Sequence, residues 1–156
     1  MSESKFRSDL GDFNSIICFR AMVVGLERIM GTQAARGNLI RAGRLRGIEI
    51  IQQLDLSKTD KSISEWLPIV SRAIGKDGTR LCSLDRVEED GNKYRVYLSE
   101  TICSAGEEQG SDRCLSFTQG AILGAVEELT GHRLSSEQIG SVLRGDSFDI
   151  VELTIR

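Results

Sequence analysis

Hydrophobic periodicity predicts helices in the first part of the chain. Residues 16–30 carry apolar side chains around much of a helix that Asp12 or Asn14 can cap and that Gly31 can end. Such a helix lies either in the core or in a dimer interface, and the core is the simpler interpretation. A second helix is predicted for residues 32–54, because a threonine cap precedes a recurring set of apolar positions.

Two pairs of strands are predicted where the apolar residues recur at every second position. They are residues 79–89 and 93–102 around Asp90-Gly91-Asn92, and residues 136–144 and 147–156 around Gly145-Asp146. A short third helix, residues 62–74, precedes the first pair, and a fourth helix lies between the pairs. The order ααα-ββ-α-ββ predicts an α+β fold with helices on a four-stranded, mainly antiparallel sheet. We expect a polar arm at residues 1–11 and a single domain over residues 12–156.

The fourth helix, residues 115–129, is the segment around which the chain is predicted to be organised. Gly120 and Gly124 lie in its interior, where each costs about 1 kcal/mol relative to alanine unless a close approach compensates. Gly43 and Gly47 repeat this spacing in the second helix. Each pair of glycines forms a smooth stripe on its helix. The two glycine stripes can pack backbone to backbone or leave a slot between the helices, and the sequence leaves both open.

Composition and charge narrow the classes of partner. The net charge of −3 and the scattered basic residues do not favour nucleic acid, and four arginines of the second helix are interpreted as a solvated face: Arg36, Arg41, Arg44 and Arg46. No apolar run approaches the roughly 18 residues of a membrane span, and the N-terminus lacks a secretory pattern. We therefore expect a cytoplasmic protein with reduced cysteines.

The sequence lacks the common motifs of catalytic sites. The sequence has no phosphate-binding loop, nucleophile elbow or Cys-x-x-Cys pair, and its only histidine, His132, is not spaced from Cys103 and Cys114 as zinc sites require. Three adjacent acidic pairs are interpreted as solvated charge: Glu88-Glu89, Glu107-Glu108 and Glu127-Glu128. The glycine-rich segment that precedes the fourth helix is either a mobile lid or a plain solvated connection. These patterns favour a protein without catalytic activity.

Two motifs resemble a known family. The second helix contains Gly31-Thr32-Gln33-Ala34-Ala35 and Ala42-Gly43-Arg44-Leu45-Arg46-Gly47, and the fourth contains Cys114-x-x-Phe117-x-x-Gly120-x-x-x-Gly124 through Gly131. Together with the terminal Gly145-Asp146 turn, their order resembles the 4-vinyl reductase-like, hydrocarbon-binding domain family over about residues 14–155. Cysteines that the family often has near that turn and after the preceding glutamate are replaced here by other residues, so metal or thiol chemistry at those positions is not expected.

The resemblance implies a fold like that of small TRAPP vesicle-tethering subunits, a homodimer, and a cavity for a lipophilic molecule such as a hydrocarbon, a lipid or a tetrapyrrole. It also implies a role as a ligand-sensing domain or in pigment or photosystem assembly. We expect non-catalytic binding between the second helix, the fourth helix and the sheet. The candidate ligand-binding residues are Ile40, Gly43, Gly47, Phe117, Ala121 and Gly124, with Cys103 and Cys114 near the mouth. The alternatives are an assembly protein that binds a protein partner and a tetrapyrrole-modifying reductase.

Overall fold

The computed structural model describes residues 7, 9 and 15–156, so the expected caps Asp12 and Asn14 and most of the expected arm lie outside the described residues. The elements are α1 (Ile16–Met30), α2 (Thr32–Gln53), α3 (Ile63–Ile74), β1 (Ser83–Asp90), β2 (Lys93–Ser99), α4 (Phe117–Thr130), β3 (Leu134–Gly140), the 3-10 turn η1 (Val142–Arg144) and β4 (Asp149–Ile155). Their order and class confirm the predicted α+β fold.

The sheet is antiparallel throughout and has the strand order β1-β2-β4-β3. The Gly91 turn joins β1 to β2 as predicted, with Asp90 opposite Lys93. The second hairpin is wider than predicted, because η1 and Gly145 occupy the connection and β4 begins only at Asp149. Pairing of β2 with β4 joins the two hairpins into one sheet.

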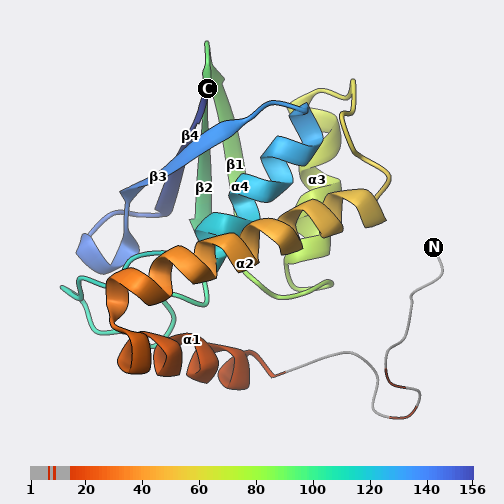
Figure 1. The fold of residues 1–156 in the computed structure, drawn as a ribbon. Helices are drawn as coiled ribbons and strands as arrows, with labels where there is room; N and C mark the ends of the chain where they lie inside the picture. Colours follow the sequence, from red (N-terminus) through yellow and green to blue (C-terminus); the bar gives the residue numbers. More distant parts are fainter. Residues whose placement is uncertain (1–6, 8, 10–14) are drawn as a thin grey trace.

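Helix α4 lies at the centre of the molecule. Residues 118–127 are all buried, and Gly131 ends the helix in the left-handed conformation that glycine favours. Figure 1 shows α2 crossing in front of α4, the sheet behind α4, and α1 along the lower side of α2. The prediction that this segment organises the chain agrees with its burial.

The crossing of α2 with α4 is made by the four glycines. A Cβ added to Gly43 or Gly47 would overlap backbone atoms of α4, and one added to Gly120 or Gly124 would overlap carbonyl oxygens of α2. The glycine stripes therefore pack backbone to backbone, and the structure has no slot at these positions. Close packing is the compensation for four glycines in helix interiors.

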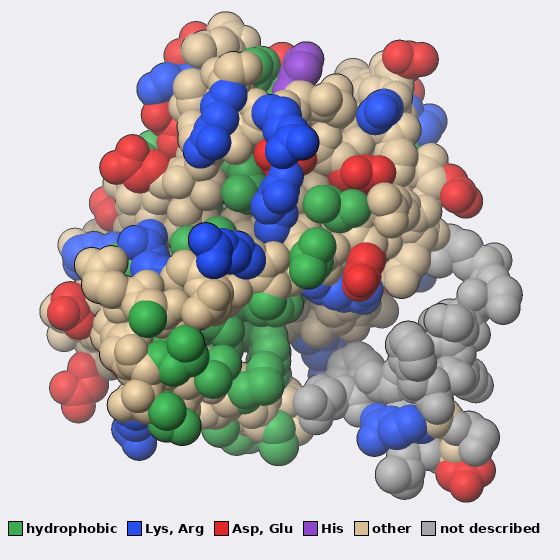
Figure 2. Space-filling view, viewed as in Figure 1, with side chains coloured by type: hydrophobic (Ala, Val, Ile, Leu, Met, Phe, Trp, Pro, Cys, Tyr) green, Lys and Arg blue, Asp and Glu red, His purple; other side chains and the backbone are tan. Residues whose placement is uncertain are grey.

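Helix α1 is peripheral, so its interpretation as a core helix was wrong. Val23 is buried and Phe19 and Leu26 pack against the core, but the opposite face carries exposed Ile17 and Ile29, whose surfaces are 76% and 83% accessible. Figure 2 shows hydrophobic side chains gathered on the lower part of the molecule, where α1 lies. One face of α1 thus completes the core and the other faces solvent.

Candidate functional site

An apolar pocket lies where α1 folds back over the rest of the domain. Its volume is about 190 Å³, and its lining comes from α1, α2, the first residue of α4 and the segment before β1: Ile16, Phe19, Arg46, Ile50, Thr79, Leu81 and Phe117. The pocket does not border the sheet, which differs from the predicted position. A cavity with mostly apolar walls and a few polar groups is the usual form of a small-molecule site.

Two phenylalanines join α1 to α4 at this pocket. The rings of Phe19 and Phe117 meet edge to face, with 4.8 Å between their centroids and an interplanar angle of 86°. This geometry places the positive edge of one ring against the negative face of the other. Because Phe19 belongs to α1, the pocket keeps its present shape only while α1 stays in place.

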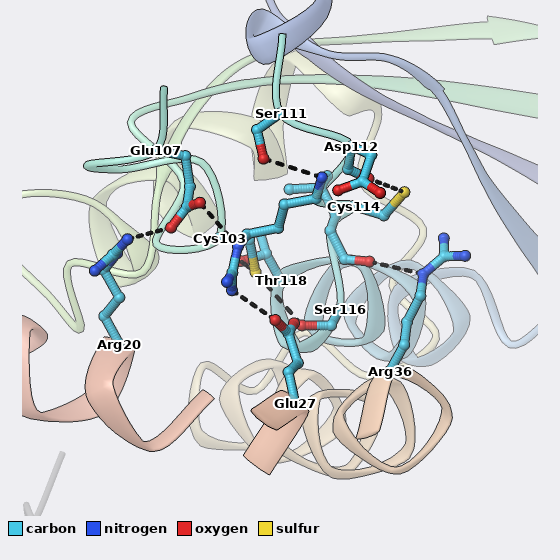
Figure 3. A network of polar contacts seen from close by, with 12 residues as sticks. Arg20, Glu27, Arg36, Cys103, Glu107, Ser111, Asp112, Cys114, Ser116 and Thr118 are labelled. Atoms are coloured by element: carbon cyan, nitrogen blue, oxygen red, sulfur yellow. Dashed lines mark hydrogen bonds and ion pairs between the residues drawn. The ribbon is translucent and has the colours of Figure 1, made fainter. Parts of the chain in front are cut away.

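A half-buried ion-pair network also holds α1. Arg113 lies between two carboxylates, with Nη1 2.8 Å from Glu27 of α1 and Nε 3.4 Å from Glu107, and Arg20 of α1 pairs with Glu107. Figure 3 shows Arg20 and Glu27 reaching from α1 toward the loop that carries Glu107. The prediction of a solvated Glu107 is therefore wrong, because this carboxylate links α1 to the segment between β2 and α4.

The β2–α4 loop, residues 100–116, is fixed at its start by a buried carboxylate. Asp149 Oδ2 accepts hydrogen bonds of 2.7 Å from the hydroxyls of Thr101 and Ser104, and Asp149 Oδ1 accepts one of 3.1 Å from the backbone N–H of Val142. Thr101 and Asp149 are fully buried. The loop is consequently held in place at its start, whereas residues 105, 106 and 108–110 are exposed.

The structure places the cysteines in different environments. Cys103 is buried with its sulfur 3.6 Å from the Ser116 hydroxyl, whereas Cys114 is half-buried and Cys18 is exposed. Burial, helped by the nearby Cys103, raises the pKa of the Cys82 thiol to about 12, so this thiol stays protonated at neutral pH. Among residues 15–156 and the two described arm residues, no three His, Cys, Asp or Glu side chains come together as a metal site.

The predicted site residues separate into three groups. Phe117 lines the pocket, Gly43, Gly47, Ala121 and Gly124 lie in the helix crossing, and Ile40 contributes the backbone carbonyl that faces Gly120. Cys103 and Cys114 lie in or beside the β2–α4 loop. The structure brings only Phe117 to the pocket wall, and a ligand role for the other residues stays a prediction.

The fold is similar to two solved structures. Over 92% of this chain and 76% of the other, it matches the phenol-responsive sensory domain of the transcription activator PoxR with phenol, at a TM-score of 0.68 and 13% identity. Over 91% and 97%, it matches a trafficking protein particle complex subunit 3 from Naegleria fowleri covalently bound to palmitic acid, at a TM-score of 0.51 and 15% identity. No protein-family model and no curated protein matches the sequence.

These likenesses concern the fold. The second match confirms the predicted likeness in fold to small TRAPP subunits, because it extends over 91% of this chain. Within the described residues, no helix is long and apolar enough to cross a membrane.

Several charged residues were misread as solvated. Arg44 Nε lies 2.5 Å from a carboxylate oxygen of the buried Glu127, and Arg36 donates to the Leu115 carbonyl and to Gln119 on α4. These arginines attach α2 to α4 on either side of the glycine contact. Only the exposed Arg41 fits the predicted solvated face.

Arg46 is the fourth arginine of that set, and it lines the pocket. Its Nη1 donates to Glu49 Oε2 at 3.2 Å, with the two side chains 35% and 59% exposed. An exposed pair at this helical spacing is worth about 0.3–0.5 kcal/mol. Sequence reasoning missed Arg46, Ile50 and Leu81 as pocket residues, because periodicity does not show where α1 folds back.

Proposed function

We propose that the chain is a non-catalytic module that binds one small hydrophobic molecule in the pocket beneath α1. The observation that carries the proposal is the apolar pocket itself, which Phe19, Ile50, Leu81 and Phe117 line. The PoxR domain that shares the fold is described as phenol-responsive, and the trafficking subunit as bound to palmitic acid, so both neighbours support a ligand in this architecture.

The pocket volume favours a ligand of one ring or a short chain. An apolar cavity of roughly 150 Å³ is enough for benzene, and drug-sized ligands occupy about 300–1,000 Å³. The observed value of about 190 Å³ is close to the first figure. A tetrapyrrole would require α1 to move away, so neither pigment binding nor a tetrapyrrole reductase is the function that this geometry favours.

Apolar burial sets the scale of the affinity. A single ring buries roughly 150–250 Å², which at about 25 cal/mol per Å² supplies about 4–6 kcal/mol. This range corresponds to dissociation constants from about 1 mM to tens of micromolar. Tighter binding therefore needs a polar contact as well.

The resemblance to the 4-vinyl reductase-like family supports the same proposal. The motif glycines Gly43, Gly47, Gly120 and Gly124 are the residues that make the α2–α4 crossing, so the shared pattern has a structural reason. We propose that the chain belongs to this family on the strength of that agreement.

Toluene binding to two matched variants tests the proposal. Ile16 lines the pocket and its neighbour Ile17 points to solvent. At toluene concentrations ten times the dissociation constant, the wild type should gain about 1.4 kcal/mol of stability. Ile16→Trp should abolish this gain by filling the pocket, and Ile17→Trp should keep it. Equal responses from the two variants would place the ligand elsewhere, and native mass spectrometry of freshly purified protein would show any ligand that co-purifies.

A second function, assembly through protein contacts, is supported by the outer face of α1. Ile17, Met22 and Ile29 are exposed there, and Leu45 of α2 is exposed as well. Exposed apolar side chains that form a patch mark association sites. We propose a homodimer through this face, which predicts that Ile29→Glu lowers the mass measured by analytical ultracentrifugation to that of a monomer. The same change at the exposed Ile139 of β3 should leave the mass unchanged.

A further inference from the structure

The pocket is lined by polar as well as apolar side chains. Arg46 and Thr79 are the two polar residues among those that line it, and the remaining described residues of the lining are apolar. In small-molecule sites, the few polar groups of an apolar pocket fix the orientation of the ligand and decide its chemical class.

The charge of Arg46 is the least committed among the arginines that α2 directs toward other elements. Arg36 and Arg44 are bound to groups of α4, and their contacts span more than 70 residues of sequence. Among the described residues, Arg46 instead forms a hydrogen bond and ion pair only with its helix neighbour Glu49, through a single donor. A guanidinium has five N–H donors in a planar fork, so four remain for a ligand or for water.

Thr79, an exposed residue, adds a hydroxyl to the same lining. Its backbone N–H donates to the Ala73 carbonyl at 2.9 Å, which attaches the residue to the end of α3. The Thr79 hydroxyl makes no hydrogen bond to another described residue, and it is able to donate to an oxygen of a ligand.

We infer that the ligand is a small carboxylate with an apolar body of one ring or a short chain. The inference rests on the proposed function, since it uses the same pocket. The body lies between Phe19, Phe117 and Leu81, and the carboxylate meets the guanidinium of Arg46 at the rim. Arginine suits this role because its fork matches both oxygens of a carboxylate, whereas lysine offers a point charge.

The geometry also explains why Glu49 does not block the site. Its side chain is 59% exposed, it does not line the pocket, and it holds Arg46 through one hydrogen bond. A ligand carboxylate approaching from the pocket side therefore competes with a weak, solvated partner. Removing the Glu49 charge should raise the affinity for the ligand rather than lower it.

Three probes that share a ring and differ in the head group test the inference: benzoate, phenol and toluene. Calorimetric titration of the full chain should show benzoate binding at least tenfold more tightly than toluene, with phenol between them. Raising the salt concentration should lower the affinity for benzoate and leave the affinity for toluene unchanged, because salt screens only the charged head group.

Variants of α2 separate the head group from the pocket. Arg46→Leu should lower the affinity for benzoate at least tenfold and change the affinity for toluene less than twofold. Arg46→Lys should lower the benzoate affinity by an intermediate factor. Glu49→Gln should raise the benzoate affinity about twofold. Arg41→Leu, on the exposed side of the same helix, is the matched control and should change neither probe.

The outcomes distinguish a failure of the carboxylate inference from a failure of the pocket proposal. If toluene binds the wild type as tightly as benzoate, or if Arg46→Leu leaves benzoate unchanged, the carboxylate inference is overturned and the pocket proposal stands. If no probe binds and Ile16→Trp changes nothing, the proposed function itself fails. A phenol affinity above that of benzoate also overturns the inference, because it assigns the rim to a neutral hydroxyl.

Discussion

Two contacts of opposite kinds hold the helices in place: α2 packs against α4, and α1 packs against the rest of the domain. The α4 contact is backbone against backbone at four glycines, and Arg36 and Arg44 add polar links to it. The α1 contact is made by side chains: a ring pair, a few partly buried apolar residues and the Glu107 network. A contact between two backbones has no side chains that can change rotamer, whereas a side-chain contact can form again after a displacement. The α2–α4 contact is therefore suited to a rigid scaffold, and the α1 contact to a pocket wall that can be displaced.

The largest effect is expected where the backbones touch. Gly47→Ala should destabilise the protein by about 3 kcal/mol or more, because the added methyl overlaps the Ala121 carbonyl oxygen and neither helix backbone can shift cheaply. Gly37→Ala on the same helix meets no atom within 4 Å and should stabilise by about 0.5–1 kcal/mol. Urea denaturation measures both. A loss below 1 kcal/mol for Gly47→Ala would contradict the description of a rigid crossing.

Truncation of the ring pair should have a moderate and local effect. Phe19→Ala removes a half-buried ring and should lower the free energy of unfolding by about 2 kcal/mol. In hydrogen exchange, amides of α1 should report a lower opening free energy than amides of α4, since α4 keeps its contacts with α2 and the sheet when α1 leaves. Equal opening free energies in the two helices would mean that α1 does not open separately. Arg28→Ala, at an exposed position of the same helix outside the proposed dimer face, is the control.

The ion-pair network should contribute less than the rings. Glu107→Gln removes the carboxylate that Arg20 and Arg113 share, and should cost about 1 kcal/mol and speed exchange in α1. High salt should produce part of the same change in the wild type. The exposed Arg72–Asp77 pair, at 4.0 Å, gives a comparison in which Asp77→Asn changes nothing measurable. An equal effect of both substitutions would remove the distinction between a link and a surface charge.

The smallest effect concerns Cys82, in the core that both contacts enclose. Its pKa rises from 9.0 to about 12 on folding, so its stabilisation is complete below pH 9 and is lost as pH rises toward 12. At pH 9.5 the protein should be less stable than at neutral pH by about 1 kcal/mol. Cys82→Ala should lack this increment when denaturation is measured at both pH values. An identical pH dependence in the variant would show that the thiol titrates normally.

The pattern of the sequence was enough for the elements and the centre of the fold. Periodicity located the helices and strands, and paired glycines in two helices indicated that these helices meet. It could not decide between contact and slot at Gly43 and Gly47, because a glycine looks the same in either surrounding. The structure resolves this through the positions of backbone atoms on α4.

The candidate site was harder to predict because its walls come from distant segments. Phe117 was recognised within a motif, but Phe19 joins it only after α1 folds back across nearly a hundred residues of sequence. Arg44 and Arg46 are two residues apart on one helix, yet one reaches Glu127 and the other the pocket. The charge pattern of the sequence predicts neither contact, since both depend on which side chains the neighbouring elements place nearby.

The four-glycine crossing has a consequence for how this domain can diverge. A contact specified by the absence of side chains constrains those four positions and places no demand on the chemistry of the residues beside them. Ile50 and Arg46 of α2, and Phe117 of α4, can therefore be exchanged during evolution without altering the joint between the helices. Substitutions in the pocket can in this way change the proposed ligand without changing the scaffold, because none of the four glycines lines the pocket.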